Sequence, residues 1–169
     1  GHVRPEQGLL VTIEDHACEE TPGGRKSAAI AHWNVAKIKR LGADGVKILA
    51  WYRPDADPEI CAHQEAFVEE VGRACVEHDI CFLLELLTYP LPGDDAQTTD
   101  YIEHAAKRPE RVIESLRAFT DPRFCVDLFK LESPLAAARV PEPGSPEAAA
   151  CQTWFDQLGQ IATRPWVML

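Results

Sequence analysis

The sequence predicts an α/β fold in which strands alternate with helices and the strands form a parallel sheet. Five short apolar segments are separated by stretches whose apolar residues recur at helical spacing. The segments are apolar on nearly consecutive residues, which is typical of parallel strands buried on both faces. A right-handed series of such units forms either a doubly wound sheet or a barrel. No glycine-rich phosphate-binding motif follows any segment, which disfavours a nucleotide-binding sheet.

The first strand is predicted over residues 9–14, where an apolar run ends in charge. Residues 19–25 are predicted to form a loop, because Pro22-Gly23-Gly24 interrupts regular structure. A short helix follows, with Asn34 as its N-cap and Gly42 as the residue that ends it.

The second strand is predicted over residues 45–51. In the polar turn that follows, Asp57 can cap a helix and Pro58 can occupy its first position. This helix is predicted over about 59–78, and the third strand over 80–87.

The second half of the chain repeats the alternation. Two short helices are predicted at about 100–107 and 109–119, after a loop over 90–99. A strand (124–131), a loop (134–144), a helix capped by Ser145 and a last strand (166–169) follow. The last helix is expected to point Trp154, Phe155, Leu158 and Ile161 inward.

The composition excludes several classes of function. The chain has 27 acidic and 17 basic residues, and its net charge of −10 argues against a nucleic-acid partner. No apolar run approaches the length of a membrane span. None of the six cysteines forms a C-x-x-C motif, so free thiols in a reducing cytoplasm are expected, without a metal site.

Charged residues interrupt four consecutive strands that should be entirely apolar. They are Glu14, Lys47, Glu85 and Lys130. An unpaired charge in a doubly buried strand costs several kcal/mol, so neighbouring strands that each carry one are expected to pair them. In a barrel such residues converge inside the wall, where barrel enzymes assemble their sites. Each charge alone could instead be a buried ion pair or an edge residue, and for Glu14 both interpretations stay open.

Two lysines and a glutamate in an apolar pocket suit aldol cleavage through an iminium ion. Burial and a second cation lower the pKa of a lysine, so that a neutral amine can attack a carbonyl. Burial raises the pKa of a carboxyl group, so Glu85 could pass a proton. This chemistry needs no metal or cofactor, and it leaves open which lysine is the nucleophile. By strand parity Glu132 shares the face of Lys130 and could bind substrate at the pocket mouth, whereas Asp127 points away.

Three segments resemble the tagatose 1,6-bisphosphate aldolase family and the related sulfofructosephosphate aldolases. They are GADGVKILAWYRPDAD (42–57), FVEEVGRACVEHDICFLLELLTY (67–89) and DPRFCVDLFKLESPL (121–135). The resemblance implies a TIM (β/α)8 barrel and a class I, metal-independent aldehyde-lyase. Its reaction would cleave a ketose (bis)phosphate, such as tagatose 1,6-bisphosphate, to dihydroxyacetone phosphate and a three-carbon aldehyde. It assigns the Schiff base to Lys130, proton transfer to Glu85 and assistance with charge to Lys47.

The resemblance also implies that the chain covers about strands 3 to 7 of the barrel. Residues 1–169 are therefore expected to be a single incomplete barrel domain, part of a longer chain, with aldolase activity only in the complete barrel. The partner would be a phosphorylated sugar, and the open sheet edges favour a homo-oligomer. A sulfonate-specific aldolase and a non-catalytic barrel fragment with an assembly or regulatory role remain alternatives.

Overall fold

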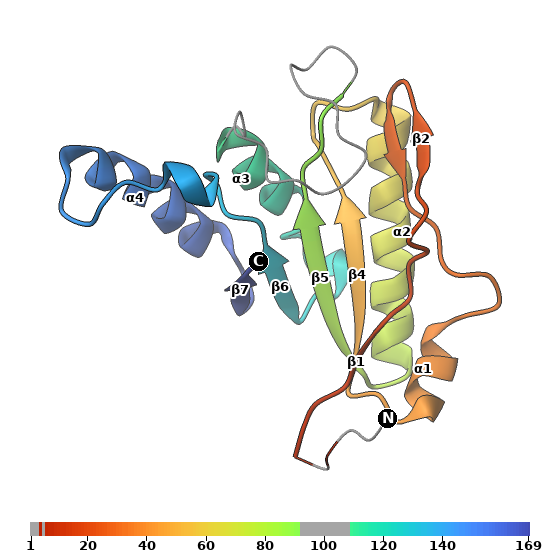
Figure 1. Ribbon diagram of the computed structural model, residues 1–169. Helices are drawn as coiled ribbons and strands as arrows, with labels where there is room; N and C mark the ends of the chain where they lie inside the picture. Colours follow the sequence, from red (N-terminus) through yellow and green to blue (C-terminus); the bar gives the residue numbers. More distant parts are fainter. Residues whose placement is uncertain (1–3, 5, 92–108) are drawn as a thin grey trace.

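The computed structural model describes residue 4, residues 6–91 and residues 109–169. Its main feature is a five-stranded sheet in which all neighbouring strands are parallel (Figure 1). In sheet order the strands are β1 (Leu10–Thr12), β4 (Gly45–Trp51), β5 (Cys81–Leu87), β6 (Leu128–Leu131) and β7 (Trp166–Met168). Spatial neighbours follow chain order, as repeated strand–helix units require. The predicted parallel α/β architecture is confirmed.

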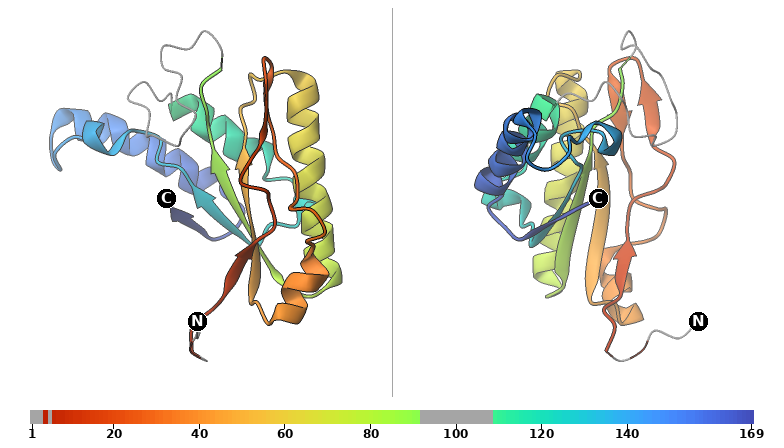
Figure 2. Two further views of the ribbon diagram at one scale, coloured as in Figure 1. Left: turned by 45° about the vertical axis from the view of Figure 1, so that its right-hand side comes forward. Right: turned by 60° about the vertical axis from the view of Figure 1, so that its left-hand side comes forward.

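The helices pack on one face of the sheet. Helices α2 (Pro58–Glu77), α3 (Pro109–Ala118) and α4 (Pro146–Ile161) gather on the same side (Figure 2), and α1 (Val35–Leu41) precedes β4. Alternate residues of the central strands, including Val46, Ile48, Phe82 and Leu84, form one buried cluster with these helices. The remaining residues of the central strands point to the opposite face.

The helix ends follow the predicted capping residues. Asn34 accepts a hydrogen bond from the backbone N–H of Lys37, and Gly42 ends α1 with a φ of 88°. Asp57 caps α2 with Pro58 in the first turn, and the Ser145 side chain accepts from a backbone N–H of the first turn of α4. These local signals were sufficient because each cap involves residues close together in sequence. No helix of the described ranges is long and apolar enough to cross a membrane.

The loop predicted over residues 19–25 was wrong. The segment is an antiparallel hairpin of β2 (Glu19–Thr21) and β3 (Gly24–Lys26). Pro22-Gly23 forms its turn, and Gly24 has a φ of 144°, a conformation that other residues rarely adopt. The hairpin strands carry mostly polar residues, so they lack the apolar alternation from which a strand is predicted.

Smaller corrections concern the second half of the chain. The fourth strand begins at Leu128, because Pro122–Phe124 forms a 3₁₀ turn and Cys125 has a φ of 54°. The loop over 134–144 contains the 3₁₀ turn Ala137–Arg139. In α4 only Leu158 is fully buried, and the other three predicted core residues are partly exposed. The predicted helix at 100–107 and most of the loop before it lie outside the described residues.

Candidate active site

The register of the sheet brings the predicted site residues to one face. Glu85 on β5 is the partner of Lys130 on β6 and of Leu49 on β4. Lys47 lies two residues before Leu49 and therefore points to the same face. Since the buried cluster under the helices takes up the alternate residues, this face is the one opposite the helices.

Glu85 lies between the two lysines. Its Oε2 is 3.1 Å from Nζ of Lys47, and its Oε1 is 2.9 Å from Nζ of Lys130. The Glu85 side chain is only 6% exposed, whereas those of Lys47 and Lys130 are 24% and 32% exposed. A shielded carboxylate that contacts two amines open to solvent can exchange a proton with either of them.

A second carboxylate extends this arrangement. Oε1 of Glu14 is 2.9 Å from Nζ of Lys47, and the hydroxyl of Thr12 donates to Oε2 of Glu14. Glu14, Lys47, Glu85 and Lys130 thus form a row of alternating charge from the end of β1 to β6. Its side chain joins the cluster as an ion pair with Lys47, a contact that fits either interpretation left open for Glu14.

The cluster changes the acidity of Lys47. Burial is the largest single effect and by itself lowers the pKa of this lysine. The hydrogen bonds and charges of Glu14 and Glu85 together outweigh burial, so the pKa of Lys47 is raised above its ordinary value. Lys47 is therefore a cation at neutral pH, and a protonated amine is not a nucleophile.

Glu132 lies directly after β6 and is buried, with 3% of its surface exposed. Its Oε2 accepts hydrogen bonds from the backbone N–H of Thr88 (3.0 Å) and from the Thr88 hydroxyl (2.9 Å). It therefore ties the carboxyl end of β6 to that of β5. Asp127 lies at the other end of the sheet and accepts from the backbone N–H of Phe82 at 2.9 Å, which agrees with a structural role.

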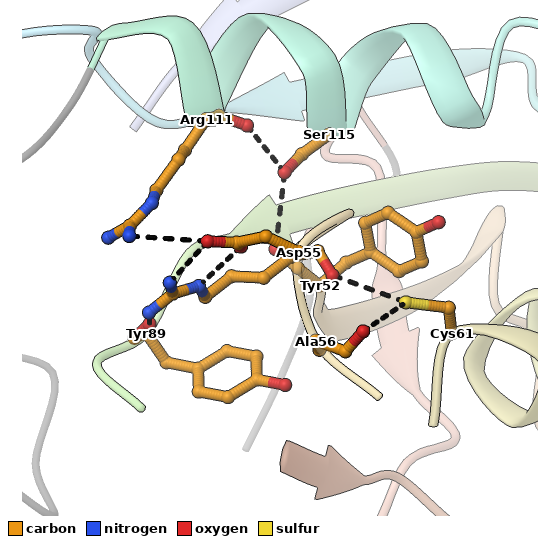
Figure 3. A network of polar contacts seen from close by, with 8 residues as sticks. Tyr52, Asp55, Ala56, Cys61, Tyr89, Arg111 and Ser115 are labelled. Carbon is orange, nitrogen blue, oxygen red and sulfur yellow. Dashed lines mark hydrogen bonds and ion pairs between the residues drawn. The ribbon is translucent and has the colours of Figure 1, made fainter. Parts of the chain in front are cut away.

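A polar network that the sequence does not predict lies beside the carboxyl ends of β4 and β5 (Figure 3). Arg53 is 2% exposed, donates to the carbonyl of Tyr89 at 2.8 Å and forms two hydrogen bonds with Asp55. Arg111 of α3 lies 3.2 Å from the same Asp55 carboxylate. Hydrogen bonding from Arg53 is the main reason why the pKa of Asp55 is lowered. The sequence predicts only a polar turn for Arg53 and Asp55, and nothing in it links them to Tyr89 or Arg111.

The hairpin is anchored to the same end of the sheet. The backbone N–H of Arg25 donates to the Tyr89 hydroxyl at 3.1 Å, and its guanidinium lies 4.5 Å from the centre of the Trp51 ring. The amide of Gln64, which is buried, bonds to both Ser27 and the carbonyl of Trp51. Trp51 shares the face of Lys47, so the hairpin contacts the face of the sheet that carries the charged cluster.

A model of the DeoC/LacD family of aldolases matches residues 4–149 of the chain. The chain belongs to this family. It is 38% identical over 132 residues to tagatose 1,6-diphosphate aldolase 2 of Enterococcus faecalis, covering 77% of this chain and 38% of that protein. It is 30% identical over 172 residues to tagatose 1,6-diphosphate aldolase 1 of Streptococcus mutans, covering 99% of this chain and 52% of that protein. The chain thus spans about half the length, or less, of these curated relatives.

Solved structures confirm the fold of this family member. A crystal structure of an archaeal fructose 1,6-bisphosphate aldolase superposes with a TM-score of 0.58 at 16% identity. The match covers 99% of this chain and 53% of that chain. A Schiff-base-forming fructose-1,6-bisphosphate aldolase gives a TM-score of 0.57 at the same identity. The prediction of a portion of a (β/α)8 barrel is confirmed.

Proposed function

We propose that this family member carries the catalytic cluster of a class I aldolase that cleaves a ketose bisphosphate, such as tagatose 1,6-bisphosphate. The products would be dihydroxyacetone phosphate and a three-carbon aldehyde. The observation that carries the proposal is the shared position of Glu85, within hydrogen-bonding distance of two lysines on neighbouring strands. The names of the similar tagatose 1,6-diphosphate aldolases support the choice of substrate.

In this proposal Lys130 is the nucleophile. Its neutral amine attacks the ketone carbon, and the carbinolamine loses water to form an iminium ion, with Glu85 supplying the proton that leaves with the hydroxyl group. Loss of the C4 hydroxyl proton breaks the C3–C4 bond, and the electron pair moves into the iminium to give an enamine. Protonation of the enamine and hydrolysis release dihydroxyacetone phosphate and restore the amine.

Lys47 acts in this scheme as a fixed positive charge. Its raised pKa keeps it protonated, so that it does not compete with Lys130 for the ketone. Its ammonium contacts the other oxygen of Glu85, at 3.1 Å, so the positive charge is held beside the carboxylate that Lys130 also contacts. Glu132 remains a predicted substrate-binding residue, and its position two residues after Lys130, where it bonds to Thr88 just after β5, supports this prediction.

The remaining barrel strands would have to come from further polypeptide. The strands β1 and β7 are the edges of the sheet, and Leu10 and Val167 on them are 51% and 46% exposed. We therefore treat residues 1–169 as a single incomplete barrel domain of a longer chain, which closes over these edges and completes the substrate site. Association of barrels into a homo-oligomer is part of the same proposal.

Borohydride trapping tests the proposed function. The complete natural polypeptide that contains this sequence is incubated with dihydroxyacetone phosphate and borohydride, and the adduct is located by peptide mass spectrometry. We expect a reduced adduct on Lys130, absent in Lys130→Met and retained in Lys39→Met, which changes an exposed lysine of α1. No adduct, or an adduct on Lys47 alone, would contradict the assignment.

One observation favours a second candidate, a non-catalytic barrel module. The four charges of the cluster satisfy one another as ion pairs, as they would in a purely structural network. That candidate predicts that Lys130→Met is neutral or stabilising and that no ketone is trapped. A sulfonate-specific aldolase, in contrast, would trap dihydroxyacetone phosphate but would prefer a sulfonated ketose in cleavage assays.

A further inference from the structure

We infer that Glu14 is a positioning residue of the proposed site: its carboxylate holds the Lys47 ammonium beside Glu85 and thereby keeps a positive charge next to the reacting amine of Lys130. The inference rests on the proposed function and adds a residue to the same site. It concerns a group that would not itself touch the substrate.

The contacts of Glu14 orient its carboxylate. Oε1 accepts from Lys47 at 2.9 Å, while Oε2 accepts from the hydroxyl of Thr12. The side chain is only 11% exposed, and the Glu14 backbone bridges to Ala29 on the segment that follows the hairpin. Both oxygens and the main chain are thus held, so the carboxylate presents a fixed acceptor to Lys47.

Lys47 needs such an acceptor. A lysine has a flexible four-carbon stem and three donors on its ammonium group, and much rotamer freedom is lost when it is held in one place. Glu85 alone would give Lys47 one oxygen, because the other oxygen of Glu85 contacts Lys130. With Glu14 on the opposite side, the ammonium is held between two carboxylates.

The charged groups around Lys47 in the described residues are few. Glu14 and the neutral Thr12 face it from the β1 side, and Glu85 faces it from β5, with Lys130 beyond on β6. After burial, which lowers the pKa of Lys47, the hydrogen bond that the Lys47 ammonium donates to Glu14 is the largest contribution, and it raises the pKa. Removing the Glu14 charge should therefore lower the pKa of Lys47.

A purely structural role is the alternative. Glu14 could neutralise a half-buried lysine without any influence on catalysis. Such a role predicts lower thermal stability for a Glu14 variant, but an unchanged dependence of kcat on pH in the protein that remains folded. A positioning role predicts that the fall of kcat on the alkaline side of its pH profile moves to lower pH in the variant, because Lys47 then loses its proton at lower pH.

The test uses Glu14→Gln in the complete natural polypeptide, with Asp15→Asn as a matched control. Asp15 is the adjacent carboxylate and is exposed. We expect Glu14→Gln to lower kcat about ten- to a hundredfold, as misplacement of a catalytic group does, and to shift the alkaline limb to lower pH. Asp15→Asn should leave both unchanged. In Glu14→Gln with Lys47→Arg, the limb should return to higher pH, because a guanidinium does not titrate in this range.

A measurement independent of turnover keeps this inference separate from the proposed function. Nitrogen-15 NMR of the Lys47 ammonium should report a lower pKa in Glu14→Gln than in the unmodified protein. Should Glu14→Gln fail to fold, Thr12→Val removes the hydroxyl that orients Glu14, and a smaller shift in the same direction is expected. An unchanged dependence of kcat on pH in the folded variant overturns the positioning role even where the Lys47 titration shifts, and an unchanged Lys47 titration overturns the contact on which that role depends. Failure of borohydride trapping in the unmodified protein would instead refute the aldolase assignment, whatever Lys47 does.

Discussion

Replacement of Glu85 by Gln is the most informative perturbation of the cluster, because it keeps the shape of the side chain and removes its charge and its proton. In the structure this carboxylate contacts Lys47 at 3.1 Å and Lys130 at 2.9 Å and is nearly shielded from solvent. If Glu85 transfers protons during formation and hydrolysis of the Schiff base, kcat should fall by about 10²- to 10⁴-fold.

The effect on stability should be much smaller than the effect on rate. Removing one partner of a fully buried ion pair costs about 3–5 kcal/mol. Both lysines are partly open to water, however, and Lys47 keeps its contact with Glu14. We therefore expect a loss of about 1–2 kcal/mol in the free energy of unfolding, since solvent screens partly exposed pairs.

The assay compares Glu85→Gln with Glu69→Gln in the complete natural polypeptide. Glu69 is also a partly shielded carboxylate with two cationic partners, Arg73 and Arg123, but it lies on α2, across the sheet from the cluster. Stopped-flow single turnovers report the rate, and urea unfolding reports stability. A kcat for Glu85→Gln within threefold of that of the unmodified protein, or an equal loss of rate in Glu69→Gln, would refute the proposed proton-transfer role.

Three further predictions concern the charge of Lys47, a close helix contact and the hairpin. Because the pKa of Lys47 is raised in the folded state, its charge stabilises the fold fully below the ordinary pKa of 10.5, and this contribution is lost as pH rises through the folded-state pKa. In urea unfolding, the difference in the free energy of unfolding between the unmodified protein and Lys47→Met should therefore decrease as pH rises through the folded-state pKa of Lys47. An increase in this difference would contradict the prediction. In α2, a Cβ at Gly72 would overlap the Phe124 carbonyl, so Gly72→Ala should destabilise the folded protein by about 2–4 kcal/mol. In α4, a Cβ at Gly159 would meet open space, so Gly159→Ala should stabilise the folded protein by about 0.5–1 kcal/mol. Equal effects at both glycines in thermal unfolding would contradict the packing described here. Gln64→Leu should leave the carbonyl of Trp51 and the N–H of Ser27 without their partner, which should lower the free energy of unfolding by about 1–3 kcal/mol. Hydrogen exchange at the Ser27 amide should become faster. Unchanged exchange at this amide would show that other contacts hold the hairpin.

The elements that could be predicted share one property: their signals are local. The strand Gly45–Trp51 was predicted with its exact bounds from a run of apolar residues, and the helices were predicted from caps within a few residues of their ends. The hairpin at residues 19–26 was missed because its polar strands lack a local signal and its anchoring contacts are distant in sequence. Arg25 bonds to Tyr89, 64 residues away, and Ser27, directly after the hairpin, bonds to Gln64, 37 residues away. The buried position of Arg53 was missed for the same reason, since its acceptor Tyr89 lies 36 residues away.

The charged cluster could be predicted only in part, and the register explains why. Lys47 pairs with Thr12 and lies two residues before Leu49, which pairs with Glu85. The Cα of Lys47 therefore lies about 6.6 Å before the level of Glu85, measured along the strand. Its ammonium reaches that level only because the lysine side chain is long. Glu14, two residues after Thr12, lies at the same level, and the ladder continues towards it through the Ile13 N–H and the Lys47 carbonyl. The sequence places a lysine on one strand and acids on its two neighbours. Only the register of the strands shows that the Lys47 ammonium can reach the level of Leu49 and contact both Glu14 and Glu85.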